Sequence, residues 1–359
     1  MSLHFHQLTV SAVTPDTDEA VIVSLTVPPE LSEAFRFEPG QYLTLRHQVA
    51  DQDLRRSYSI CSAVGEAELR VGVRRVDGGV FSTWVNRELK VGDPIESYPP
   101  QGRFGLTAAT AKSRHCLGIA AGSGITPILS IMKTLLAREP GSRFTLIYGN
   151  RSQASTMFKE EIEDLKNRYM TRLSLHALFS REQVDAPLLA GRIDGAKVSE
   201  FLRTLVPAAG IDQAYLCGPL QMNEQAEAAL RAAGLAEELI HVERFGTLET
   251  RAGKLPRHQP QAGDADSASV LVIRDGISRE IEFSRSDSSL LGAAVRAGID
   301  LPFSCKSGVC STCRCKLLEG EVRMDKNFAL DKRELAAGFI LSCQSHALTP
   351  RLVISFDER

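Results

Sequence analysis

The sequence predicts a multi-domain fold in three parts: an antiparallel β-barrel over residues 1–107, a doubly wound α/β parallel sheet over 108–250, and a small α+β domain over 269–359. Three observations support this division. Short strand-like runs fill the first part, strands alternate with helices in the second, and five of the 8 cysteines fall between residues 305 and 343. A chain of 359 residues suits two or three domains.

The predicted barrel is based on alternating apolar and polar runs at residues 21–27, 41–46 and 68–76. Turn signals separate these runs, namely the pairs Pro39-Gly40 and Pro99-Pro100. Short strands at this spacing are typical of an antiparallel barrel or sandwich.

The middle part alternates between strand-like and helix-like segments. Apolar strand runs are expected at 116–120, 144–149, 173–179 and 214–217, and helices at 127–137, 158–169 and after residue 219. Strands that alternate with helices predict a parallel sheet with helices on both faces. Residues 251–268 are polar, contain two prolines and show no periodicity, so we expect an interdomain linker there.

The last part begins with two strand-like runs over residues 270–283, joined by the pair Asp275-Gly276, which is a strong hairpin signal. A helix over 289–298 is expected to end at Gly298. A second helix over 330–339 has Asp331 as its expected cap and Glu334 three residues later, as in a capping box.

Composition excludes several classes of function. The chain has 42 basic and 44 acidic residues, whereas a nucleic-acid partner calls for a basic surface. No apolar run approaches the roughly 20 residues that span a bilayer, so no membrane partner is expected. The first residues lack the basic and apolar regions of a signal peptide. We therefore expect a cytoplasmic protein.

The cysteine cluster has a spacing typical of a metal centre. Four residues separate its first two members, two residues separate the next two, and 29 residues precede the last. This is the plant-type 2Fe–2S spacing, in which one tight loop supplies three thiolates and a distant segment the fourth. Gly308 allows the loop to bend closely, and Cys315 is expected to be a small buried residue. A structural zinc site is the alternative, although zinc favours paired knuckles. The expected ligands are Cys305, Cys310, Cys313 and Cys343.

Residues 56–59, Arg-Ser-Tyr-Ser, have the chemistry of a flavin site. Arg56 can hold a pyrophosphate through charged hydrogen bonds, and Tyr58, two residues along a strand, can lie on the flavin ring. The Ser59 hydroxyl can reach the flavin N5 atom. A surface arginine in a strand is the ordinary alternative. A second pyrophosphate contact is expected where a helix begins, from Gly78, Gly79 and Ser82.

Residues 121–127 follow an apolar strand and begin a helix, which is the arrangement of a nucleotide-binding turn. Gly122 and Gly124 let the backbone approach a phosphate, and Thr126 is expected to cap the helix. The helix N-terminus then offers its N–H groups to a pyrophosphate.

The coenzyme is expected to be NADPH. No acidic residue follows the second strand of the sheet, where NAD enzymes bind the ribose 2′-hydroxyl. Arg151 stands there instead, and Arg181 follows the next strand, so both can accept a 2′-phosphate. The alternative is that these are ordinary solvated arginines and that NADH serves as well.

The motifs resemble two known families. CKSGVCSTC with the later LSCQ resembles a plant-type 2Fe–2S ferredoxin domain, which implies a β-grasp-like fold. The R-x-Y-S and G-G-x-x-S motifs resemble ferredoxin–NADP reductase-like flavoproteins, which implies FAD. That resemblance places Val73 at the flavin site and the turn at Cys217-Gly218 beside the nicotinamide. It places Glu243 and Phe245 near the flavin edge, with Ser59 and Glu243 as the catalytic candidates.

The domain order resembles reductase components of bacterial oxygenases, closest to those that serve the di-iron phenylacetyl-CoA epoxygenase of phenylacetate catabolism. This resemblance implies electron flow from NADPH through FAD and a 2Fe–2S cluster to an oxygenase component. Two alternatives remain open. One is the NADH-linked reductase of another oxygenase, such as a 3-ketosteroid hydroxylase or an aromatic-ring dioxygenase. The other is an iron–sulfur redox sensor without turnover.

Overall fold

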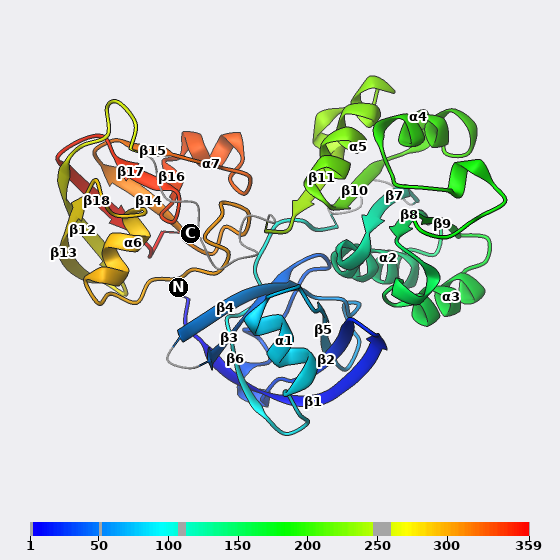
Figure 1. The fold of residues 1–359 in the computed structure, drawn as a ribbon, viewed down its shortest axis with the longest axis horizontal. Coiled ribbons are helices and arrows are strands. Elements are labelled where there is room, and N and C mark those ends of the chain that lie inside the picture. The colour runs from blue at the N-terminus through cyan, green and yellow to red at the C-terminus, as the bar shows by residue number, and fades with distance from the viewer. Residues whose placement is uncertain (1–2, 50–51, 107–112, 247–259, 359) are drawn as a thin grey trace. The chain divides into compact units, whose positions relative to one another are not determined.

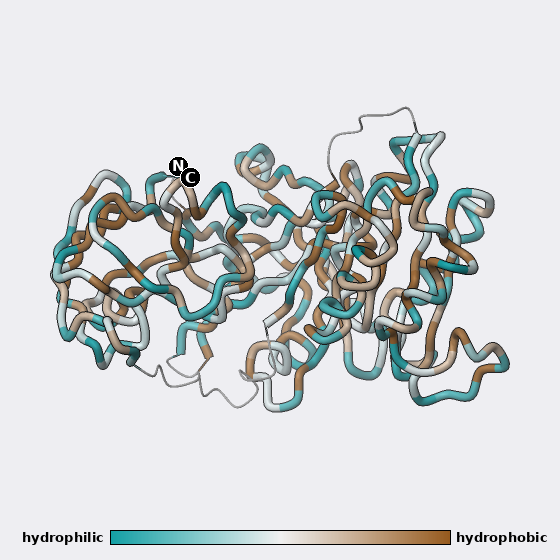
Figure 2. Tube along the Cα trace, turned by 90° about the horizontal axis from the view of Figure 1, so that it is seen from above, coloured by the Kyte–Doolittle hydropathy of each residue, from teal (hydrophilic) through white to brown (hydrophobic). Residues whose placement is uncertain are grey.

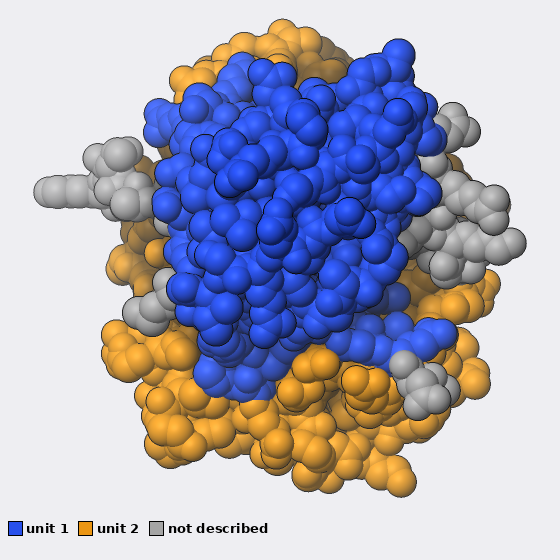
Figure 3. Space-filling view, turned by 90° about the vertical axis from the view of Figure 1, so that its left-hand side faces the viewer, with its two compact units in different colours: residues 1–6, 50–57, 246–359 blue, residues 7–49, 58–245 orange. Residues whose placement is uncertain are grey.

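A computed structural model describes residues 3–49, 52–106, 113–246 and 260–358 (Figure 1). The chain divides into two units, shown in different colours in Figure 3. Unit 1 comprises Met1–His6, Ala50–Ser57 and Gly246–Arg359, and unit 2 comprises Gln7–Val49 and Tyr58–Phe245. Among the described residues, no helix is both long enough and apolar enough to cross a membrane.

The first sheet is antiparallel, with six strands in the order β4-β3-β6-β1-β2-β5. A bridge between Ile60 and Val71 joins the chain after β4 to β5, so the sheet closes into the predicted barrel. Helix α1 (Val80–Arg87) connects β5 to β6 and buries Phe81. The strands are β1 His6–Thr17, β2 Ala20–Thr26, β3 Tyr42–Val49, β4 Gln52–Ser59, β5 Leu69–Arg74 and β6 Pro94–Ser97.

The second sheet is parallel and has the order β11-β10-β7-β8-β9. The first strand, β7, lies between β8 and β10, so the strand order reverses at β7 as in a doubly wound fold. The prediction of this fold is therefore confirmed. The strands are β7 His115–Ala121, β8 Arg143–Asn150, β9 Leu173–Phe179, β10 Gln213–Gly218 and β11 Ile240–Arg244. The helices are α2 Ile125–Arg138, α3 Lys159–Arg168, α4 Gly195–Thr204 and α5 Leu220–Ala232.

Helix α2 is buried along most of its length because it lies in the core of unit 2. Its residues Ile128 and Met132 are fully buried. They belong to one hydrophobic cluster with Ala20 and Cys61 of the barrel part and Phe144 of the parallel sheet. The strongly hydrophobic stretches of the chain appear brown in Figure 2.

The C-terminal domain combines a five-stranded sheet, in the order β13-β12-β18-β14-β16, with the pair β15-β17. Its strands are β12 Ser267–Arg274, β13 Ile277–Ser284, β14 Arg314–Glu319, β15 Val322–Met324, β16 Phe339–Leu341, β17 Ser345–Ala347 and β18 Arg351–Ser355, and its helices are α6 Leu290–Arg296 and α7 Lys332–Ala336. Strand β12 begins inside the range expected for the linker, and residues 251–259 of that range lie outside the described residues. The domain boundaries thus stay predictions.

Three local predictions in this domain are confirmed. Asp275 and Gly276 have φ angles of 56° and 71°, which is the two-residue turn that joins twisted antiparallel strands. Gly298 adopts a φ angle of 74° just after α6 ends. Asp331 caps α7 in a capping box with Glu334, whose side chain accepts from the Asp331 backbone N–H.

Candidate functional site

The structure brings the four clustered cysteines together in two pairs. The Cys310 thiol hydrogen-bonds the Cys305 sulfur, and the Cys313 thiol hydrogen-bonds the Cys343 sulfur. Three of them lie on the loop between α6 and β14, and Cys343 lies between β16 and β17. Within the described part of the chain, no three His, Cys, Asp or Glu side chains converge on one ion. Two thiolates for each of two irons is the donor set of a 2Fe–2S centre.

Backbone N–H groups of the cysteine loop donate to two of its sulfurs, while the pairing with Cys305 and burial raise the pKa of Cys310. The pKa of Cys305 is lowered, first by the hydrogen bond from Cys310 and then, against the effect of burial, by N–H groups of the loop. The Ser307 N–H lies 3.4 Å from Cys305 Sγ, and the Cys305 N–H lies 3.5 Å from Cys310 Sγ. Backbone donors around thiolates suit a centre whose ligands must be deprotonated.

The backbone at Gly308 fits a loop wrapped around such a centre. Gly308 has a φ angle of 79°, and a Cβ atom there would lie 2.9 Å from the carbonyl oxygen of Lys326. Any larger residue is therefore excluded on conformational and steric grounds. Cys315 is fully buried within the C-terminal core, and burial raises its pKa well above the ordinary value. It belongs to the packing of β14, as expected.

Two of the three predicted flavin residues on β4, Arg56 and Tyr58, occupy one face of the strand. Arg56 is exposed, and its guanidinium donates to the Arg55 carbonyl oxygen at 2.8 Å. Tyr58, two residues further, lies with its ring centroid 5.9 Å from that of Phe81. Alternate residues of a strand share a face, so both side chains project from the same surface. Ser59 is buried.

The second group of predicted flavin residues surrounds the start of α1. Gly78 has a φ angle of 70°, and Gly79 is the N-cap residue of α1. The buried Ser82 hydroxyl accepts from the Val76 N–H at 3.1 Å, which fixes the turn before the helix. Val73 is wholly buried in β5, and its carbonyl oxygen accepts a hydrogen bond from the Asn86 side chain.

The predicted nucleotide turn lies where β7 and β10 end. Gly122 has a φ angle of 53°. A Cβ atom on Gly124 would lie 2.0 Å from the Cys217 carbonyl oxygen, so the two strand ends are in close contact. In an open α/β sheet, ligands bind in the crevice at the carboxyl ends of the strands where the order reverses. Burial raises the pKa of Cys217 far above its ordinary value, which makes this thiol a packing group, and Gly218 follows it directly.

Two expectations about the helix that follows this turn are wrong. Helix α2 begins at Ile125 rather than at residue 127, and its N-cap residue is Gly124 rather than Thr126. Thr126 instead lies in the first turn, where its hydroxyl donates to the Ser123 carbonyl oxygen at 3.0 Å. The short turn of 3₁₀ helix at Gly122–Gly124 starts the helical path early, so the threonine is not needed as a cap.

The structure places Arg151 in an ion pair that the sequence did not indicate. Its guanidinium lies 2.5 Å from the Glu19 carboxylate, which also accepts from Arg74 at 2.9 Å. The pKa of Glu19 is lowered, chiefly by the hydrogen bond from Arg74. Arg181 is exposed, and its backbone N–H donates to the Arg151 carbonyl oxygen at 2.9 Å. The separation of 132 residues between Glu19 and Arg151 hides this contact from sequence patterns.

The remaining two predicted residues lie in the last strand of the parallel sheet and directly after it. Glu243 is in β11, and its carbonyl oxygen accepts from the Asn223 side chain at 3.0 Å. Phe245 is partly buried against the hydrophobic cluster around α2. Both stay proposals for the flavin edge.

Comparisons with known proteins agree with this arrangement. The chain matches the Oxidoreductase FAD-binding domain over residues 8–105, the Oxidoreductase NAD-binding domain over 119–228, and the 2Fe-2S iron-sulfur cluster binding domain over 272–348. The FAD, NAD(P) and 2Fe–2S parts are therefore all present, in the predicted order.

Relatives cover the whole chain. This chain is 45% identical to one of the subunits of 1,2-phenylacetyl-CoA epoxidase from Escherichia coli (strain K12), and the match covers 99% of this chain and 98% of that protein. It is 33% identical to the ferredoxin reductase component of 3-ketosteroid-9-alpha-monooxygenase from Rhodococcus rhodochrous, covering 97% and 96%. The fold is similar to that of phthalate dioxygenase reductase, with a TM-score of 0.61, 24% identity and 98% of each chain covered. The chain therefore belongs to the family of oxygenase reductases that join an FAD-binding, an NAD-binding and a 2Fe–2S domain in one polypeptide.

Proposed function

We propose that this chain is the reductase component of a phenylacetyl-CoA epoxidase and that NADPH is its electron donor. The observation that carries the proposal is the 45% identity, along 99% of the chain, to one of the polypeptides of that enzyme. The likeness extends across all three matched domains. The four paired cysteines, the turn at Gly78-Gly79 and the turn at Gly122–Gly124 are the residues that an electron-transfer reductase needs for its cluster, flavin and nucleotide.

Bound FAD and a 2Fe–2S cluster supply the conversion of a two-electron hydride into single electrons. The polypeptide supplies position and charge. We assign Arg56, Tyr58 and Ser59 to the phosphate, ring and N5 edge of the flavin. The start of α1, with Gly79 as its N-cap residue and Ser82 in its first turn, is assigned to the pyrophosphate, because the first N–H groups of a helix have no partner within it. The nicotinamide dinucleotide is assigned to the crevice beside Gly122, Gly124 and Gly218, and the cluster to the cysteines Cys305, Cys310, Cys313 and Cys343.

Arg151 supports NADPH over NADH, but a 2′-phosphate must compete with Glu19 for it. The side chains of Arg151 and Glu19 are 38% and 37% exposed, so water partly screens their ion pair. Breaking the pair therefore costs little free energy. A phosphate carries more charge than a carboxylate and accepts two parallel hydrogen bonds from a guanidinium. We therefore infer that the 2′-phosphate replaces Glu19 on Arg151.

We expect the substitution Arg151→Ala to raise the KM for NADPH by about tenfold, with a much smaller change for NADH. The companion substitution Glu19→Gln should act in the opposite direction and lower the KM for NADPH, because it removes the competing charge. Steady-state cytochrome c reduction with each coenzyme measures both effects. Equal changes for the two coenzymes in Arg151→Ala would refute the 2′-phosphate assignment.

The partner is tested by coupled turnover. With NADPH as donor, the holoprotein should support epoxide formation by the oxygenase component of a phenylacetyl-CoA epoxidase. This rate should be at least about tenfold higher than the rate of steroid oxidation that it supports with the oxygenase component of a 3-ketosteroid monooxygenase. Turnover with the steroid enzyme alone would reassign the partner. A flavin-loaded and cluster-loaded sample that fails to reduce even cytochrome c would instead favour a redox sensor.

A further inference from the structure

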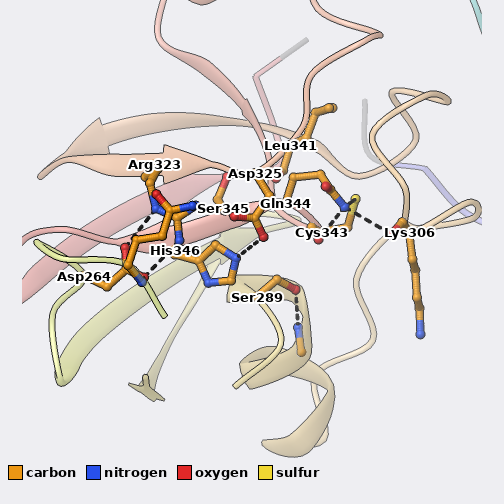
Figure 4. A network of polar contacts seen from close by, with 12 residues as sticks. Asp264, Ser289, Lys306, Arg323, Asp325, Leu341, Cys343, Gln344, Ser345 and His346 are labelled. Carbon is orange, nitrogen blue, oxygen red and sulfur yellow. Dashed lines mark hydrogen bonds and ion pairs between the residues drawn. The ribbon is translucent and has the colours of Figure 1, made fainter. Parts of the chain in front are cut away.

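The side chain of Gln344 connects the two segments that carry the clustered cysteines. Its Nε2 atom lies 3.1 Å from the Lys306 carbonyl oxygen and 3.0 Å from the Cys343 carbonyl oxygen. The same atom lies 3.6 Å from Cys343 Sγ (Figure 4). All three neighbours are acceptors, so the amide NH₂ group rather than the amide oxygen must face them. Lys306 directly follows Cys305, so this one amide spans the loop and the remote ligand.

The position of Gln344 is fixed by its surroundings. The residue is 8% exposed. Its backbone N–H donates to the Leu341 carbonyl oxygen at 2.9 Å, and its carbonyl oxygen accepts from the Asp325 N–H at 2.9 Å. Its Cγ lies 3.3 Å from the position that a Cβ atom would take on Gly308. The glutamine methylenes therefore lie against the turn of the cysteine loop at Gly308.

A polar network holds the segment that follows Gln344. His346 is fully buried, and its Nε2 lies 3.0 Å from Asp325, which also pairs with Arg323 (Figure 4). Arg323 makes two further hydrogen bonds of 2.9 Å to the buried Asp264 and lowers the pKa of that carboxyl to about 2. Strands β15 and β17 pair directly beside this network. The backbone that carries Gln344 thus has little freedom to move.

A hydrogen bond to a cysteine sulfur affects the two redox states of an iron–sulfur centre unequally. Reduction adds one negative charge, part of which resides on the sulfur ligands. A donor near that sulfur therefore stabilises the reduced state more than the oxidised state, as charge-assisted hydrogen bonds do in general. Hydrogen bonds to the sulfurs are among the features that set the potential of these centres. Outer partners of ligands also fix their orientation.

We propose that Gln344 is a positioning residue of the iron–sulfur centre: its amide holds the cysteine loop and Cys343 together and hydrogen-bonds the Cys343 sulfur, which raises the reduction potential. The proposal rests on the assignment of a 2Fe–2S cluster to the four cysteines. It adds a residue outside the ligand set that controls how readily the centre accepts an electron from the flavin.

The test uses the full-length holoprotein and a potentiometric titration followed by electron paramagnetic resonance. Gln344→Met keeps the length of the side chain and removes the donor, and Gln344→Glu replaces the donor by a charge of the wrong sign. Ser345→Ala is the matched control, because it removes a neighbouring hydrogen bond that does not involve a cysteine sulfur. In that bond the Ser345 hydroxyl donates to the Leu341 carbonyl oxygen at 2.8 Å. We expect Gln344→Met to shift the one-electron equilibrium by up to about tenfold toward the oxidised state, or roughly 59 mV. Gln344→Glu should shift it further, while the control should be unchanged.

Unchanged potentials in Gln344→Met and Gln344→Glu, with full iron content, would overturn the proposal. A second measurement does not depend on a variant. Wild-type protein labelled with ¹⁵N in the glutamine side chains should show a nitrogen coupling to the reduced cluster, and its absence would also overturn the proposal. If the wild type itself gives no 2Fe–2S signal after reconstitution, the cluster assignment fails, and the proposal for Gln344 fails with it.

Discussion

In Cys310→Ser, reduction of cytochrome c by NADPH should fall by more than about 100-fold, while reduction of the flavin by NADPH stays close to the wild-type rate. Cys310 is buried and its thiol pairs with Cys305, so the substitution removes half of one of the two sulfur pairs. Loss of an outer partner alone costs metal sites 10- to 100-fold, and loss of a ligand should cost more. Flavin reduction should be unaffected, because the residues proposed to bind FAD and the nucleotide belong to the barrel and the parallel sheet. Anaerobic stopped-flow spectroscopy and steady-state assays measure the two steps separately.

Cys315→Ala is the matched control for this experiment. Cys315 lies in the same domain and is fully buried, but it packs in the hydrophobic core rather than in a sulfur pair. The control should keep its iron and its cytochrome c activity. Loss of flavin reduction in Cys310→Ser would argue against separate roles of the domains, and loss of iron in Cys315→Ala would argue for a different ligand set.

Much of this fold could be predicted because local rules and tertiary structure agree. The pair Asp275-Gly276 forms the expected turn because its two residues tolerate positive φ angles, and Asp331 caps α7 because its side chain reaches the free N–H groups of the helix. The cysteine spacing likewise reflects one tight loop and one remote segment. For the turn and the cap the determining contacts lie within a few residues, and the cysteines are informative because their spacing is itself a recognisable pattern.

The missed features depend on contacts between residues far apart in sequence. The ion pair of Arg151 with Glu19 joins the parallel sheet to the hairpin between β1 and β2, and no spacing rule reports it. Helix α2 begins earlier than the sequence predicts because a 3₁₀ turn at Gly122–Gly124 precedes it, where Gly124 closely approaches the distant Cys217. Gln344 stands next to a recognised cysteine, but only the path of the loop brings the Lys306 carbonyl oxygen to its amide.

The second large effect is expected at the opposite end of the electron path. Gly124→Ala should slow flavin reduction by NADPH at least about 100-fold, because a Cβ atom there would lie 2.0 Å from the Cys217 carbonyl oxygen and 2.5 Å from its carbonyl carbon. Strand β10 is hydrogen-bonded on both sides, to β7 and β11, so the backbone of Cys217 cannot move away from the added Cβ atom. The turn of Gly124 must move instead, and a displacement of about 1 Å at a site that positions reactants can cost 100-fold in rate.

Gly210→Ala provides the control, because Gly210 lies in the short 3₁₀ helix before β10, where a Cβ atom would meet only the Arg143 guanidinium at 3.8 Å, an ordinary contact. Gly124→Ala should still bind FAD, and after chemical reduction it should pass electrons to cytochrome c at the wild-type rate. Gly124→Ala should thus lose flavin reduction and keep electron delivery. Cys310→Ser should show the opposite pattern, because its flavin accepts hydride but its cluster cannot deliver electrons. If Gly124→Ala reduced its flavin normally, the crevice between β7 and β10 would not be the nucleotide site. Because each substitution is expected to spare the step that the other blocks, the two results together would establish the direction of electron flow.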